Sequence, residues 1–205
     1  MRRGLSRSQR KIGTPSPDNR KRIVVFTEGE KTEVSYLEYW ARLNKGDINV
    51  DISNQHGVPW SLVNWAASRR REERRYTGRS RCSTEYWCVF DVNSHSRVPD
   101  SIEMARANDI NLAVSNPCIE LWFILHFGEQ AAHIERHDAQ RRSKRVLAWD
   151  KKALPGELLE VLADRYDDAK SRAQRLDEKH DGDGRRPRSN PSSEIWKLVD
   201  RIRSA

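Results

Sequence analysis

Short apolar segments alternate with amphipathic segments between residues 23 and 128 of this chain. The apolar segments are typical of β-strands and lie at 23–27, 48–53, 86–92 and 111–114. Segments with helical periodicity follow them at 32–43, 59–75, 101–108 and 119–127. Strands that alternate with helices pair in parallel, because each helix carries the chain back to the same end of the sheet. The pattern predicts an α/β fold, with a mostly parallel four-stranded sheet and flanking helices.

The last third of the chain follows a different pattern, in which only helices are expected. They lie at 136–149, 157–176 and 194–202, and a Gly-, Arg-, Asp- and Pro-rich stretch at 180–191 is expected to be mobile. We therefore predict three parts. They are a basic, disordered leader at 1–22, an α/β domain at 23–128, and a helical C-terminal extension at 129–205 that packs on it.

The positive charge is concentrated in the leader. Residues 1–22 contain eight basic residues and one acid, which accounts for seven of the eight net positive charges. One interpretation is an arm that binds a phosphate backbone, with Arg20, Lys21 and Arg22 nearest the domain. The other is a solubilising tail, and the composition favours neither.

The composition also limits where the protein works. No apolar stretch approaches the roughly 20 residues that a membrane span needs, and the leader lacks the apolar core of a secretory signal. The three cysteines, Cys82, Cys88 and Cys118, include no CxxC pair and suit a reducing compartment. We expect a cytoplasmic protein with no membrane partner.

Polar residues stand at the ends of three predicted strands. Glu28 follows the first strand, and Asp91, Asn93 and His95 lie at the end of the third. Ser115 and Asn116 follow the fourth, with Glu120 one turn into the next helix. The carboxyl ends of parallel strands share one edge of a sheet, where α/β proteins place their ligands. Glu28 and Asp91 would suffice to hold Mg²⁺, which takes one or two carboxylates with water and phosphate oxygens. Such a metal could activate water against a phosphodiester.

Each of these residues also has a purely structural interpretation. An Asp-x-Asn pair after a strand often forms a turn or a helix cap. Glu120 could complement the dipole at the start of its helix. Its neighbours are apolar, however, and a buried acid needs a partner or a metal.

Four segments resemble the motifs of the RloB-like protein family, which is itself similar to the Toprim group. They are Thr-Glu-Gly-Glu-Lys-Thr-Glu at 27–33, Phe-Asp-Val-Asn at 90–93, Ser-Asn-Pro-Cys-Ile-Glu-Leu-Trp at 115–122 and Asn-Pro-Ser-Ser at 190–193. The resemblance implies a Toprim/Rossmann-like fold and a nuclease that depends on Mg²⁺ or Mn²⁺. It also implies DNA or RNA as substrate, an ATPase as partner, and a role in bacterial anti-phage defence.

The same resemblance assigns roles to individual residues. Glu28 corresponds to the catalytic acid/base or metal ligand, Asp91 to a metal ligand, and Glu120 to a further catalytic acid. In the nuclease hypothesis, which the resemblance does not itself extend to this residue, Lys31 would contact phosphate. Asn93 is a departure, because Toprim proteins usually have a second Asp there. An amide oxygen can ligate a metal but adds no charge.

The loss of that charge leaves three hypotheses open. Glu30, Glu33 or Glu120 could supply the missing acid, and the protein would then be a metal-dependent nuclease. Alternatively, the site is degenerate and the protein is a non-catalytic nucleic-acid-binding or regulatory subunit of an ATPase-containing system. A third possibility is an interaction module that contacts the ATPase through the C-terminal helices.

Overall fold

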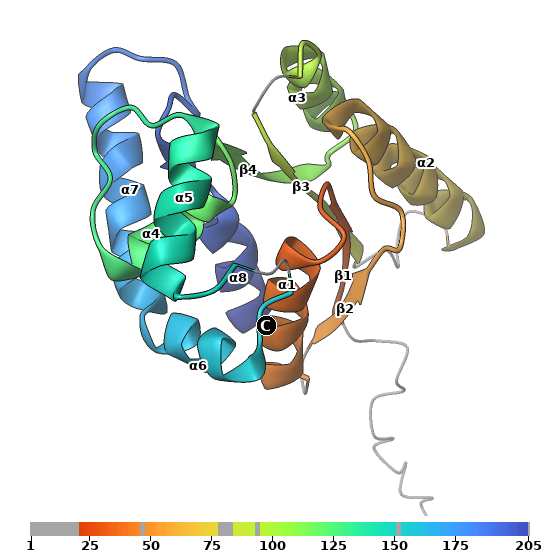
Figure 1. Ribbon diagram of the computed structural model, residues 1–205. Coiled ribbons are helices and arrows are strands. Elements are labelled where there is room, and N and C mark those ends of the chain that lie inside the picture. The colour runs from red at the N-terminus through yellow and green to blue at the C-terminus, as the bar shows by residue number, and fades with distance from the viewer. Residues whose placement is uncertain (1–20, 46–47, 78–83, 93–94, 151–152, 205) are drawn as a thin grey trace, which may run out of the picture.

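The fold is an α/β sandwich around one mixed sheet (Figure 1). The computed structural model describes residues 21–45, 48–77, 84–92, 95–150 and 153–204. The strands of the sheet are β1 (Lys21–Thr27), β2 (Ile48–Ile52), β3 (Thr84–Asp91), β4 (Asn111–Asn116) and β5 (Ser192–Ser193). They lie in the order β2-β1-β3-β4-β5. The first four are parallel, and β5 is antiparallel to β4. The predicted mostly parallel α/β fold is confirmed, with β5 as an additional short strand.

The helices agree with the predicted ones in number and place through α5. They are α1 (Thr32–Leu43), α2 (Pro59–Thr77), α3 (Val98–Ala107), α4 (Glu120–Phe127), α5 (Arg136–Leu147), α6 (Gly156–Asp164), α7 (Tyr166–Gly182) and α8 (Ile195–Arg203). The single helix predicted at 157–176 is in fact α6 and α7, which meet at Arg165. The α7 helix continues to Gly182, so it includes the start of the stretch predicted to be mobile.

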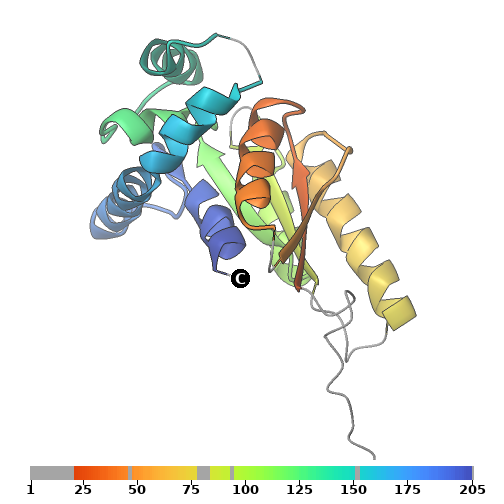
Figure 2. The same cartoon turned by 90° about the horizontal axis from the view of Figure 1, so that it is seen from below.

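Alternate residues of β1 face two separate apolar cores. Val24 and Phe26 pack with α2 and α3, whereas Ile23 and Val25 pack with α1, α4 and the C-terminal helices. Figure 2 shows α1 and α8 on one side of the sheet and α2 on the other. A strand covered on both faces is apolar at every position, which explains the unbroken apolar runs of β1 and β3.

The C-terminal segment contributes to the sheet as well as covering it. Ser193 of β5 pairs with Ser115 of β4, and the two hydroxyl oxygens lie 3.0 Å apart. The buried Glu194 carboxylate follows β5 and accepts hydrogen bonds from Arg188 Nε at 2.8 Å and from Lys197 Nζ at 2.7 Å. These contacts fix the start of α8 against the sheet.

The strand order places a topological switch point between β1 and β3. The chain leaves β1 to form β2 on one side and then returns to form β3 on the other. In open α/β sheets, ligands bind at the carboxyl ends of the strands beside such a point. Glu28 and Asp91, at the ends of β1 and β3, therefore lie where a ligand is expected.

The basic residues next to the leader lie at the opposite edge of the sheet. The β1 strand begins at Lys21, so Lys21 and Arg22 belong to the strand and not to the predicted leader. Arg22 forms an ion pair with Asp51 on β2 at 2.6 Å. Arg20 and the rest of the leader lie outside the described residues.

Candidate acidic site

The Glu28 side chain is positioned by the end of β3. Its backbone N–H donates to the Val89 carbonyl at 2.9 Å, which extends the β1–β3 pairing by one residue. Its Oε2 accepts a hydrogen bond from the Asp91 backbone N–H at 3.1 Å, and its Oε1 lies 3.0 Å from His95 Nε2. The carboxylate therefore spans the switch point, with one oxygen on the strand end and the other on an imidazole.

Asp91 is the last residue of β3, and only 6% of its surface is exposed. Burial raises the pKa of its carboxyl well above the ordinary value, and the negative charges of Glu33, Glu28 and Glu120 raise it further. Arg136, at the start of α5, opposes this shift. Asp91 is thus a buried acid surrounded mainly by other acids.

Glu33 brings a third acid to the same place from the first turn of α1. It is 7% exposed, and its Oε1 accepts a hydrogen bond from the Gly29 N–H at 3.1 Å. Burial is the main cause that raises its pKa, and the charges of Glu120 and Glu28 contribute. A Cβ on Gly29 would lie 2.6 Å from the Glu33 carboxyl carbon. Only glycine therefore lets this carboxylate lie against the turn.

The turn between β1 and α1 is held by side-chain contacts of its own. Thr27 Oγ1 donates to the Gly29 carbonyl at 2.9 Å, and His56 Nδ1 lies 3.1 Å from the same hydroxyl. Both contacts keep Gly29, and with it the Glu33 contact, in place. Sequence reasoning did not identify His56, because a single histidine in a loop carries no recognisable spacing.

Glu120 completes the set as the first residue of α4. Its charge acts on both Asp91 and Glu33. We call Glu28, Glu33, Asp91 and Glu120 the acidic site. Sequence reasoning had selected three of them, and had named Glu33 only as one of several acids that could replace the missing charge.

The other predicted site residues are not part of this cluster in the described structure. Glu30 and Lys31 are exposed on the turn before α1, and no contact joins Lys31 to the four acids. Asn93 lies outside the described residues.

The donor atoms of the acidic site suit a hard divalent cation. All four side chains offer carboxylate oxygens, the ligands that Mg²⁺ and Mn²⁺ prefer. In the described part of the chain, no group of three or more His, Cys, Asp or Glu side chains is arranged so that it could hold a metal ion. Mg²⁺ usually needs only one or two carboxylates, with water and phosphate oxygens in the remaining positions. The residues present therefore fit such a metal.

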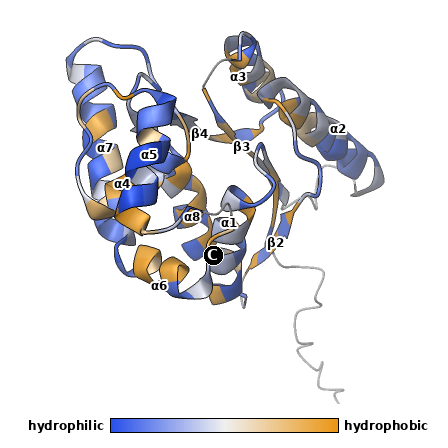
Figure 3. Ribbon diagram, in the orientation of Figure 1, coloured by the Kyte–Doolittle hydropathy of each residue, from blue (hydrophilic) through white to orange (hydrophobic). Residues whose placement is uncertain are grey.

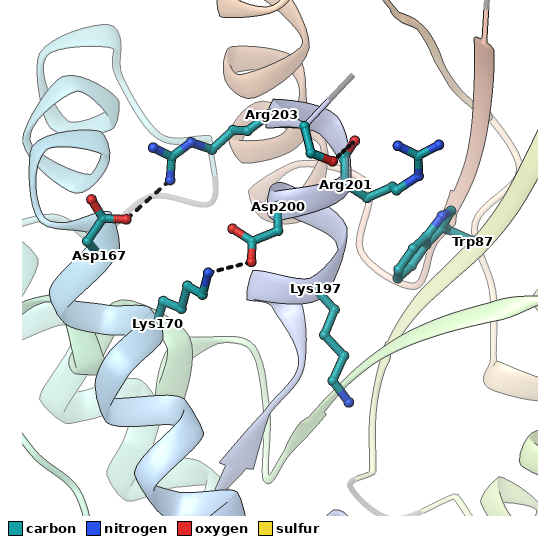
Figure 4. A pocket seen from close by; sticks show the side chains of 8 residues that line it. Trp87, Asp167, Lys170, Lys197, Asp200, Arg201 and Arg203 are labelled. Atoms are coloured by element: carbon teal, nitrogen blue, oxygen red, sulfur yellow. Dashed lines mark hydrogen bonds and ion pairs between the residues drawn. The ribbon is translucent and has the colours of Figure 1, made fainter.

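A separate pocket of about 650 Å³ lies between α7, α8 and β3 (Figure 4). Trp87 lines it and precedes Asp91 by four residues, or about 13 Å along the strand. The basic side chains around it are paired with acids: Lys170 with Asp200 at 2.6 Å, Lys197 with Glu194 at 2.7 Å, Arg201 with Glu85 at 2.5 Å and Arg203 with Asp167 at 3.3 Å. Two of these pairs join α7 to α8, and one joins α8 to β3. The described basic side chains of the pocket are thus already compensated by acids.

Comparison with known proteins assigns the chain to a family. The family model described as RloB-like protein matches residues 23–202. The chain belongs to the RloB-like family. The match contains all four residues of the acidic site, so this site lies in the part shared with the family.

Other comparisons add no nearer relative. Neither a curated protein nor a solved structure matches this RloB-like chain significantly. Among the described residues, no helix has the length and apolar character needed to cross a membrane.

Proposed function

We propose that this RloB-like protein is a nuclease that hydrolyses phosphodiester bonds of DNA or RNA with a divalent metal ion. The observation that carries the proposal is the acidic site itself. Four acidic side chains lie close enough at this edge of the sheet to influence one another's charge, and two of them, Glu33 and Asp91, are almost fully buried. Burial of like charges is unfavourable unless protonation or a bound cation compensates them, and a divalent metal would supply that compensation.

The geometry supports separate roles for these residues. Glu28 and Asp91, at adjacent strand ends, would hold the ion, and Glu120 and Glu33 would supply the charge that Asn93 lacks. When bound, Mg²⁺ or Mn²⁺ lowers the pKa of water and stabilises negative charge on a phosphodiester. The contact between Glu28 Oε1 and His95 Nε2 can hold a proton between a carboxylate and an imidazole. That proton is then available at the edge of the site.

Cleavage of labelled DNA and RNA with and without Mn²⁺ tests the proposal. Glu28→Gln should lower metal-dependent cleavage by about 100-fold or more, because it removes a charge that contacts the reacting groups. Glu30→Gln is the matched control, since Glu30 lies two residues away and is exposed. Its activity should stay near that of the wild type. Full activity of Glu28→Gln would contradict the proposal.

The non-catalytic alternative rests on Asn93 and on the basic leader; Asn93 and residues 1–20 lie outside the described residues. It predicts salt-sensitive nucleic-acid binding with no cleavage under any metal condition. The ATPase partner and the role in anti-phage defence are predictions that rest on the family resemblance. Co-purification of the tagged protein with an ATPase from its native host would test the partner.

A further inference from the structure

Helix α5 carries the most concentrated positive charge among the described helices for its length. Its twelve residues contain five Lys or Arg and one Asp. Ala139 and Ser143 face the protein interior, and the opposite side is exposed to solvent. We call that side the basic face; its basic members are His137, Arg141, Lys144 and Arg145, and the one acid exposed beside them is Asp138. Figure 3 shows α5 as a strongly hydrophilic helix.

Most of this charge is not neutralised within the protein. Arg141 pairs with Asp138 at 2.7 Å, but within the described ranges no carboxylate lies within ion-pair distance of Lys144 or Arg145. Three of the five arginines of α2 differ in this respect. There Arg69 pairs with Asp51, and Arg70 and Arg74 pair with Asp109.

Hydrogen bonds connect the N-terminal end of α5 to the edge of the sheet that carries the acidic site. The Ile134 backbone, two residues before α5, exchanges two hydrogen bonds with the Asn190 side chain, at 3.0 and 2.9 Å. Nearby in the chain, the Arg188 carbonyl accepts a hydrogen bond from the Asn116 side chain at the end of β4, at 2.8 Å. The strand end, the 188–190 segment and the start of α5 are therefore joined.

Two further observations place the start of α5 near the acidic site. The α5 helix packs on α4, which begins with Glu120, through an apolar cluster that includes Ile124, Ile134 and Ala139. Arg136, the first residue of α5, acts on the charge of Asp91. A chain of phosphates that reached the acidic site could thus continue along the helix.

We propose that the basic face of α5 binds the phosphate backbone of the nucleic acid whose scissile bond lies at the acidic site. This inference rests on the proposed function and adds the surface that holds the substrate. The helix is about 18 Å long, which corresponds to roughly five nucleotide steps at 3.4 Å each. Lys and Arg that neutralise phosphates bind without regard to sequence, and they release counter-ions. Binding through α5 therefore weakens as salt rises.

The test compares two pairs of substitutions in the full-length Glu28→Gln protein, in which we expect cleavage to be blocked. Lys144→Gln with Arg145→Gln removes two charges from the basic face. Arg71→Gln with Arg75→Gln removes two exposed charges from α2 that also lack a carboxylate partner among the described residues. Fluorescence anisotropy would follow binding of labelled single-stranded DNA, duplex DNA and RNA, each of roughly 30 nucleotides, across a salt series.

The α5 variant should lose about tenfold in affinity on each probe near 0.1 M salt, and its salt slope should fall by about one to two. The α2 variant should keep both values of the parent. Equal losses in the two variants, or none in either, would overturn the proposal. Retained nucleic-acid binding with lost binding to phosphatidylserine vesicles would assign the face to a membrane surface and overturn it as well.

The outcome is independent of the catalytic proposal, because binding is measured without cleavage. Loss of binding in the α5 variant of a protein that never cleaves would support the basic face and contradict the nuclease. Metal-dependent cleavage by the wild type, with unchanged binding in the α5 variant, would do the reverse.

Discussion

Replacement of Asp91 by Asn should stabilise the metal-free protein, and the gain should grow as pH rises. Asp91 is nearly buried, and burial and three neighbouring acids raise the pKa of its carboxyl. Between the ordinary pKa of Asp and this raised value, the native state holds a proton that the unfolded chain has lost. Stability therefore falls as pH rises through that window. Asn has no proton to lose, so the variant lacks this dependence.

The size of the effect follows from the charges in the acidic site. Two like charges 4 to 8 Å apart repel by about 2–4 kcal/mol at an effective dielectric constant near 20. Hydration and partial protonation reduce this, so we expect a net gain of about 1–3 kcal/mol at neutral pH. For a chain of this length, that corresponds to a rise in Tm of roughly 3–10 °C.

Scanning calorimetry with EDTA, from about pH 4 to pH 8, measures the difference directly. The melting temperatures of the two proteins should approach each other toward the acid end, where Asp91 is protonated in the native state. Asp100→Asn is the control, because the Asp100 side chain is 62% exposed; it should change stability by less than about 0.5 kcal/mol. An Asp91→Asn protein less stable than the wild type at neutral pH would refute the reasoning, as would a gain that did not vary with pH.

Three further substitutions test other parts of the structure. Gly29→Ala should displace the Glu33 carboxylate and lower Mn²⁺ affinity about tenfold or more. Gly128→Ala is the control, because a Cβ there meets open space, and its Mn²⁺ affinity should not change. Isothermal titration calorimetry would measure both affinities. Burial lowers the pKa of His126 to about 3, so between pH 6.5 and 3 the unfolded chain binds a proton that the native state excludes. As pH falls through this range, the free energy of unfolding should fall by about 1.4 kcal/mol per pH unit. Denaturant titrations of His126→Phe should show a weaker dependence on pH. Glu194→Ala breaks two ion pairs and leaves the buried Val114 N–H without its side-chain acceptor, so urea unfolding should show a loss of about 2–3 kcal/mol.

The parts of the fold that were predictable from sequence are those set by local pattern. The apolar run of β1 and the periodicity of α1 indicate strand, turn and helix, and polar strand ends pointed to Glu28 and Asp91. Two features were missed for lack of a local signal. The β5 strand has only two residues and exists through its pairing with β4. The break at Arg165 between α6 and α7 involves neither Gly nor Pro.

The composition of the acidic site depended on spatial contacts that no spacing encodes. Glu33 belongs to it because Gly29 leaves room for its carboxylate. Arg136 acts on Asp91 although the two residues lie far apart in the sequence, and only the packing of α5 on α4 brings them near. A polar helix was predicted there, but its relation to the site was not.

Binding of Mn²⁺ to the purified protein at neutral pH tests the central claim most directly. Electron paramagnetic resonance of free Mn²⁺ gives the affinity of the wild type and of the Glu28→Gln, Asp91→Asn and Glu30→Gln variants. We expect the wild type and Glu30→Gln to bind Mn²⁺. Glu28→Gln and Asp91→Asn should bind it at least about tenfold more weakly, because each loses a charged ligand. No binding by the wild type, or equal affinity in all four proteins, would contradict a metal site at Glu28 and Asp91.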